Sequence, residues 1–326
     1  MIRTFMVILA LLLAAGCSGG GGDVLKNDTE EETEEETGEE TEAEAPGVPD
    51  ELSQNLASFA FSPDKSSVTV EIAGIDSTPV EVTYNRNPNL DTAGYLAYTV
   101  QEDALDRLFV ALGAESPDGS TRAAIVSDGG QFNRVIQGGY YERDGSYNPP
   151  DVGPGPGQGQ VSYAGGYAGI TNITSANGSE LIEIPDTVDP DTLPDLPGQA
   201  AIVRGLIFIN ANFAENKVNG GIYNRILVSP IDGTDAQQLD DIALIITDID
   251  ENGEFLGEVE FDGFPDRSIG SYGGIFGGEN ASFVAGIVAL DEFDEDRTGE
   301  IEIGVFVLTQ CGQTGDAEVC DIVEPD

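Results

Sequence analysis

The sequence contains no histidine and no tryptophan, and its 13 lysine and arginine residues stand against 60 aspartate and glutamate residues. Without histidine, the chain lacks the usual general base of serine and cysteine hydrolases and the commonest ligand for transition metals. The formal net charge of −47 excludes nucleic-acid binding, which needs cationic side chains to displace counterions from phosphates. It also excludes electrostatic attraction to anionic lipids. A surface this acidic is compatible with cationic partners, calcium or salty surroundings.

Cysteine is scarce, and the first of the three cysteines, Cys17, follows an N-terminal apolar run, FMVILALLLAA. The run has the length of a signal-peptide core and is too short for a comfortable membrane span. Small residues directly before Cys17 resemble a bacterial lipobox. We therefore predict a lipoprotein signal peptide over residues 1–16 and lipidation of Cys17, which would anchor the protein in the membrane. An ordinary secretory peptide with an incidental cysteine is the alternative.

The other two cysteines, Cys311 and Cys320, remain as a pair in an exported protein. A disulfide between them is the natural prediction for an oxidising compartment. A zinc site is the alternative, but two thiolates without histidine or a second cysteine pair provide too few ligands.

The composition of residues 17–50 predicts a disordered acidic tether. A run of four glycines follows Ser18, and residues 28–44 are strongly acidic with no basic residue, so like charges repel and favour an extended, disordered segment. Such a tether holds a folded head away from a membrane. Ser18, a polar residue other than aspartate after the lipidated cysteine, is typical of export to the bacterial outer membrane. We expect a lipid-anchored, surface-exposed protein there.

After the tether, the sequence predicts β-strands along almost the whole chain. In residues 51–150, apolar residues recur at every second position within runs of high β-propensity, and this pattern predicts a β-rich domain. Residues 103–112 fit either a short helix or a strand, and the pattern slightly favours a strand. Residues 147–160 contain too many prolines and glycines to form a helix or a strand. We therefore place a domain boundary there, with residues 151–158 as a linker.

Residues 159–312 contain eight strand candidates, and residues 313–326 form a C-terminal tail. Mostly short connections favour antiparallel neighbours, and eight such strands are the number at which a sheet closes into a barrel filled by its own side chains. The fold class predicted is all-β, with an eight-stranded antiparallel up-and-down barrel after a smaller β-rich domain. Glycines within the strands are expected where strands bend and backbones lie close. The eight candidates are residues 160–171, 200–213, 217–228, 241–249, 254–261, 268–276, 281–290 and 300–308.

Three stretches carry a resemblance to a known family. They are GLIFINANFAENKVNGGIYNR at 205–225, FLGEV at 255–259 and GGENASFVAG at 277–286. In this order they resemble the barrel domain of transferrin-binding protein B-like surface lipoproteins. Two positions depart from the family pattern, since Glu279 stands where proline is usual and Phe283 where glutamate is usual.

The resemblance covers residues 158–310, about half of the chain. It implies an eight-stranded antiparallel barrel at the cell surface, preceded by a smaller handle-like region at 51–150. It does not imply that this protein binds transferrin, and the chain has room for one such barrel unit where the family's large members have two.

Some shorter motifs have two readings. In DIDENGEF at 248–255, Asp248, Asp250 and Asn252 have calcium-ligand spacing, but Val259 occupies the twelfth position and a hairpin turn explains the pattern better. The acidic run at 291–300 fits a loose divalent-cation site or, far more commonly, a solvated loop.

Two further motifs also have two interpretations. Asp76 and Asp91 faintly resemble aspartic-protease tripeptides, and turns between strands explain both better. Tyr140, Tyr141 and Tyr147 are either a binding cluster or strand-end packing, and packing is favoured.

These observations favour non-enzymatic recognition with no cofactor and no metal. The leading hypothesis is capture of an iron- or haem-carrying protein, or another external protein or small solute, for an outer-membrane transporter. A structural or adhesive surface lipoprotein is the alternative. Since the barrel interior is expected to be packed, loops and outer surfaces would bind, and the sequence does not assign the binding residues.

Overall fold

The computed structural model describes residues 47–73, 78–153, 159–193, 195–294 and 297–321. The described residues all belong to one compact unit, and residues 1–46 lie outside the described residues. The predicted signal peptide and Cys17 therefore lie outside the described residues as well. The helices in the described part of the chain are all too short or too polar to traverse a lipid bilayer.

The described chain is almost entirely β, which confirms the predicted fold class. The first seven strands form an antiparallel sheet in which sequence neighbours are also spatial neighbours. The sheet is rolled, because the edge strands β1 and β7 contact each other and Asn55 N–H donates to Gln137 O at 3.0 Å. These strands are β1 (Leu56–Phe61), β2 (Ser67–Ala73), β3 (Pro79–Arg86), β4 (Leu96–Val100), β5 (Phe109–Glu115), β6 (Thr121–Asp128) and β7 (Gln137–Arg143).

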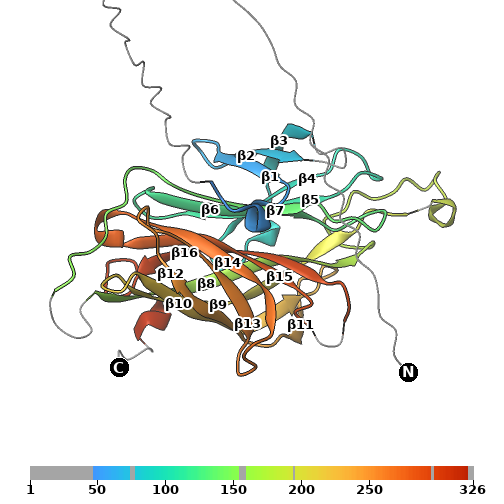
Figure 1. The fold of residues 1–326 in the computed structure, drawn as a ribbon. Coiled ribbons are helices and arrows are strands. Elements are labelled where there is room, and N and C mark those ends of the chain that lie inside the picture. The colour runs from blue at the N-terminus through green and yellow to red at the C-terminus, as the bar shows by residue number, and fades with distance from the viewer. Residues whose placement is uncertain (1–46, 74–77, 154–158, 194, 295–296, 322–326) are drawn as a thin grey trace, which may run out of the picture. The chain divides into compact units, whose positions relative to one another are not determined.

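The second sheet closes into a barrel, as predicted. Eight strands pair antiparallel in sequence order, and β9 and β16 both pair with β8, so the ring has no open edge. Figure 1 shows these strands in yellow-green to red. The barrel strands are β8 (Gln160–Ser175), β9 (Gln199–Asn212), β10 (Lys217–Val228), β12 (Ile242–Asp248), β13 (Glu254–Phe261), β14 (Ser268–Gly277), β15 (Phe283–Asp291) and β16 (Ile301–Gln310).

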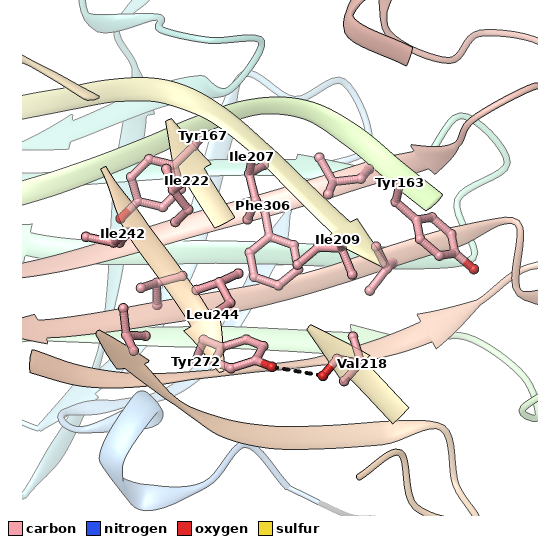
Figure 2. Close-up of a cluster of buried hydrophobic side chains, with 14 of the residues drawn as sticks. Tyr163, Tyr167, Ile207, Ile209, Val218, Ile222, Ile242, Leu244, Tyr272 and Phe306 are labelled. Carbon is pink, nitrogen blue, oxygen red and sulfur yellow. Dashed lines mark hydrogen bonds between the residues drawn. The ribbon is translucent and has the colours of Figure 1, made fainter. Parts of the chain in front are cut away.

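Aromatic and branched side chains fill the barrel interior (Figure 2). Several of the large rings lie against glycines on neighbouring strands. A Cβ atom on Gly286 would lie 2.3 Å from the ring of Phe306, and one on Gly257 would lie 2.5 Å from the ring of Tyr272. The strand glycines thus provide the space that interior rings occupy, in addition to the close backbone approach expected from the sequence.

The seven-stranded sheet packs against the outer wall of the barrel. Apolar side chains of β5 and β6 share a buried cluster with outward-facing side chains of β15 and β16, such as Ile287 and Ile303. Tyr95 ties the two sheets together, since its hydroxyl donates to Gly166 O and accepts from Val307 N–H, both at 2.9 Å. Strands at this junction are therefore buried on both faces.

The structure departs from the sequence predictions in two places. Residues 103–108 form turns, and the strand predicted over 103–112 begins only at Phe109. A short additional strand, β11 (Asp235–Gln238), pairs with β10 beside the barrel and was not predicted, because its residues are polar. The remaining elements are α1 (Asp50–Ser53) and the 3-10 helices η1 (Pro88–Leu90), η2 (Pro190–Thr192), η3 (Glu279–Ala281) and η4 (Glu318–Asp321).

Candidate functional site

The longest loops of the barrel gather at one of its ends. In an up-and-down barrel, every second connection emerges at the same end. The connections at one end are 176–198, 229–241, 262–267 and 292–300, and we call this the long-loop end. The connections at the other end, the short-loop end, are 213–216, 249–253 and 278–282.

The two ends differ strongly in charge. The four connections of the long-loop end contain seventeen acidic and two basic residues, whereas those of the short-loop end contain four acidic residues and no basic one. Like charges concentrated on loops produce a local negative potential that attracts cationic groups and repels anionic ones. The long-loop end is therefore electrostatically suited to a basic partner.

Loops of the seven-stranded sheet join the long-loop end through the 176–198 connection. Ile182 N–H donates to Gln101 Oε1 at 2.8 Å, and Phe132 N–H donates to Asp195 Oδ2 at 2.5 Å. These two contacts bring the β4–β5 loop (101–108) and the β6–β7 loop (129–136) to this end of the barrel.

Arg107 holds these two sheet loops in a fixed arrangement. Its guanidinium pairs with the buried carboxylate of Asp128 and donates to Gln131 O at 2.6 Å and Arg134 O at 2.8 Å. Burial raises the pKa of Asp128, while the hydrogen bonds from Ile136 N–H and from Arg107 oppose that rise. The clamp fixes both backbones, so the side chain at the loop tip is presented without much loss of conformational freedom on binding.

The clamped loop presents Phe132, a phenyl ring that is 54% exposed on a residue with φ of +56°. Phe264, in the 262–267 connection, is 68% exposed, and Ile231, in the 229–241 connection, is 56% exposed. Aromatic side chains are enriched at protein interfaces, where a few desolvated residues contribute most of the binding energy. The long-loop end thus combines apolar anchors with an acidic surround.

Phe264 borders a hollow of about 380 Å³ that Asp240, Asp241 and Asp262 also line. Burial raises the pKa of Tyr223, and the charges of Asp262 and Asp241 add to this rise. Within the described residues, no group of three or more acidic or cysteine side chains is close enough to hold a metal ion.

A buried polar network lies inside the barrel beneath these loops. Arg225 and Glu302, both with no exposed side-chain surface, pair at 2.7 Å between Nη2 and Oε2. The Tyr167 hydroxyl donates to the other carboxylate oxygen at 2.5 Å, and Arg225 Nη1 donates to Asp240 O at 3.0 Å. The guanidinium also lies over the ring of Phe293, 5.3 Å from its centroid. The network therefore connects the barrel interior to two of the acidic loops.

The motifs singled out in the sequence have structural roles. Residues 248–255 form the predicted hairpin turn, in which Asp250 Oδ1 accepts from the N–H groups of Asn252 and Glu254. In the 291–300 run, Asp294 and Glu300 are buried, and Asp294 N–H donates to Glu300 Oε1 at 2.9 Å. This part of the run closes the barrel end rather than lying in solvent.

The remaining predicted residues are placed as follows. Asp91 is a turn residue, since its carboxylate pairs with Arg86 at 2.5 Å and accepts from Ala97 N–H at 2.9 Å. Asp76 lies outside the described residues. The disulfide between Cys311 and Cys320 is present, which confirms that prediction.

Tyr140 packs against the buried cluster inside the rolled sheet, whereas Tyr141 and Tyr147 pack near the short-loop end. Tyr141 is buried in the sheet–barrel junction. The ring of Tyr147 lies against Gly253 and beside the guanidinium of Arg143. Arg143 Nη1 in turn donates to Asn252 O and Phe276 O, both at 2.8 Å. Packing of a strand end, and not a binding cluster, explains these residues.

Glu254, which lies close to Arg143, should make the stability of the protein depend on pH. Burial raises its pKa to about 6, Asp250 adds to the rise and Arg143 opposes it. A carboxyl whose pKa is higher in the folded state stabilises the fold below its ordinary pKa of 4.5, and this contribution is lost as the pH rises through 6. Relative to wild type, Glu254→Gln should therefore gain stability between pH 4.5 and pH 6.5, by less than about 1 kcal/mol because the group is half-exposed.

Urea unfolding of both proteins at the two pH values measures this difference. Glu258→Gln, at an exposed position on the same strand, is the matched control and should show no such change. A Glu254→Gln effect that is equal at both pH values would contradict the prediction.

Sequence reasoning missed Phe132 and Phe264. The usable signal was a lone phenylalanine in an otherwise polar or turn-forming stretch, QFNR at 131–134 and DGFPD at 262–266. An aromatic residue in such a stretch has no strand face to pack on, and aromatic side chains are enriched at protein interfaces, which makes it a candidate for contact with a partner.

Comparisons with known proteins found structural similarity only. No family model and no curated protein matches the sequence. Similar solved structures include transferrin-binding protein B of Haemophilus parasuis Hp5, with 11% identity and a TM-score of 0.35 over 77% of this chain and 52% of that one. Another is isotype 1 transferrin-binding protein B of serogroup B Neisseria meningitidis, with 14% identity and a TM-score of 0.31 over 77% and 51%. The chain thus spans about half the length of these structures.

Proposed function

We propose that this protein is a non-enzymatic recognition protein that captures an external protein at its long-loop end. The observation that carries the proposal is the combination found there, in which Phe132 and Phe264 project from loops with a large excess of negative charge. Apolar anchors supply affinity once they are desolvated, and the surrounding charge supplies rapid association and discrimination between partners.

The cellular setting of this proposal comes from the sequence. Lipidation of Cys17 and the acidic tether over 17–50 would hold a head made of a handle-like domain (51–150), a linker (151–158) and a barrel (159–312) at the surface of the outer membrane. A captured iron- or haem-carrying protein would then be passed to an outer-membrane transporter. Both the anchor and the hand-over are parts of the proposal.

A capture experiment with an anchor variant tests the proposal. The full chain is immobilised and exposed to proteins from iron-limited growth medium at low and high salt. The double variant Phe132→Ser/Phe264→Ser should retain at least tenfold less of the partner than wild type, since loss of a few central anchors costs about 2 kcal/mol or more. Retention by wild type should fall as salt rises.

The matched control is Ile246→Ser/Leu256→Ser, which removes two exposed apolar side chains from the barrel wall away from the long loops. It should bind as wild type does. Equal loss in both double variants would contradict a site at the long-loop end. Failure to retain any partner under iron limitation would contradict capture and favour the structural or adhesive role.

A further inference from the structure

A cleft of about 400 Å³ lies at the long-loop end where the two sheets meet, and we call it the junction cleft. Four separate parts of the chain line it. They are residues 89–92 between β3 and β4, residues 179–180 of the 176–198 connection, part of β9 between Gln199 and Arg204, and part of the stretch between Val228 and Gly233. Two of these parts are joined directly, since Ser179 N–H donates to Pro230 O at 3.4 Å.

The lining of the junction cleft is apolar in part and acidic in part. Leu90, Ile202 and Val228 provide apolar surface, and Glu180 and Asp232 provide carboxylates. Such a lining fits a side chain with an aliphatic stem and a cationic head, because the stem covers apolar surface while the head reaches the carboxylates.

The basic side chain in the cleft does not cancel this negative charge. Arg204 is already paired with both carboxylate oxygens of Asp235, at 2.7 and 2.8 Å. Asp91 likewise has its own partner in Arg86. The two carboxylates that remain without a basic partner among the described residues are Glu180 and Asp232.

Each of these two carboxylates is held in place by neutral donors. Asn87 Nδ2 donates to Glu180 Oε2 at 2.9 Å. Thr234 donates to Asp232 Oδ1 from its hydroxyl at 2.8 Å and from its N–H at 3.2 Å. Hydrogen bonds from Thr234 and Ser229 lower the pKa of Asp232, so its carboxylate is charged at neutral pH. Neutral donors orient a carboxylate but leave its charge available for a bound cation.

We propose that the junction cleft binds an arginine side chain of the captured protein, with the guanidinium between Glu180 and Asp232. This inference rests on the proposed function, because it names the chemistry of the partner at the same end of the molecule. Arginine suits the site better than lysine, since a planar guanidinium offers five donors in a fixed geometry to carboxylates and to the hydroxyls of Ser179 and Ser229.

The occupant is a side chain within a polypeptide and not free arginine. A free amino acid carries an ammonium and a carboxylate as well as its side chain, and the carboxylate would find no free basic partner in the cleft, because Arg204 is already paired with Asp235. A residue within a polypeptide has a neutral backbone, so it enters the cleft without removing an unpaired carboxylate from water.

Ligand-observed NMR titrations of the full chain test the inference. The probes are arginine blocked at both ends, the blocked citrulline analogue, which is nearly isosteric and neutral, and free L-arginine. Blocked arginine should bind at least tenfold more tightly than blocked citrulline and more tightly than free arginine. The variant Glu180→Gln/Asp232→Asn should weaken binding of blocked arginine at least tenfold.

The control variant Glu183→Gln/Asp266→Asn removes the same amount of charge from the long-loop end but outside the cleft. It should bind blocked arginine within about twofold of wild type, because exposed charges at a distance are screened by salt. Equal weakening in both variants, or equal binding of the arginine and citrulline probes, would overturn the cleft as a guanidinium site. Tighter binding of free than of blocked arginine would overturn the polypeptide assignment.

The outcome is separable from that of the proposed function. If blocked arginine does not bind, while capture still depends on Phe132 and Phe264, the cleft is wrong and recognition at the long-loop end stands. If blocked arginine binds as expected, but no protein is captured, the cleft stands and the proposed function is wrong.

Discussion

Replacing Glu302 with glutamine is expected to lower the free energy of unfolding by about 3–5 kcal/mol, the usual cost of breaking a buried ion pair. Arg225 and Glu302 have no exposed side-chain surface, and they form an ion pair inside the barrel with 2.7 Å between Nη2 and Oε2. The substitution leaves the guanidinium of Arg225 in the interior without its counter-charge. Buried Tyr167, whose pKa is raised well above its ordinary value by burial, also loses a charged acceptor.

Urea unfolding of the full chain measures the loss. Glu258→Gln, which makes the same chemical change at an exposed position, should alter stability by no more than about 0.5 kcal/mol. The paired replacement Arg225→Met/Glu302→Leu should recover most of the loss, because it removes both charges and leaves apolar groups in their place. A Glu302→Gln variant as stable as Glu258→Gln would show that the pair does not hold the barrel end.

The same substitution should act on the recognition loops. Arg225 donates to Asp240 O and lies beside Phe293, so its position fixes both the 229–241 and the 292–300 connections. When the guanidinium loses Glu302, these contacts weaken, and the loops should open more often than the strands that support them. Faster amide hydrogen exchange in these two connections, relative to β15 and β16, is the expected sign.

The barrel was predictable from the sequence because the turn-forming residues in its connections and the β-propensity of its strands favour the same antiparallel fold. Most connections between its strands are short and contain residues that form turns, as in the hairpin at 249–253, and the strands themselves have a high β-propensity. The β5 and β6 strands gave a weaker signal. They are buried on both faces, against the barrel on one side and inside the rolled sheet on the other, so polar residues do not alternate with apolar ones.

The candidate site was less accessible to sequence reasoning because distant contacts create it. Phe132 is presented by a loop whose shape depends on Arg107 and Asp195, and neither partner is near it in the chain. The junction cleft similarly needs residues from both sheets. The excess of negative charge could be counted along the chain, but its concentration at one barrel end follows only from the order and direction of the strands.

Replacing Gly286 with valine is expected to lower the free energy of unfolding by about 3 kcal/mol, at the upper end of the usual cost of overpacking a core. Gly286 pairs with Gly274 on one side and Phe306 on the other. A Cβ atom there would lie 2.2 Å from the backbone oxygen of Gly273 and 2.3 Å from the ring of Phe306. The ring can rotate away at some cost, but the backbone oxygen belongs to the barrel wall and cannot move without disturbing the strand pairing.

Two further variants separate this steric cost from other effects of valine. Ala289→Val, on the same strand at a half-buried position, should change stability by about 1 kcal/mol or less. Phe306→Leu combined with Gly286→Ala should lose less than the sum of the two single losses, because the smaller side chain relieves one of the two close contacts. Strict additivity would mean that the ring does not use the space above Gly286, and the role assigned to the strand glycines would then be wrong.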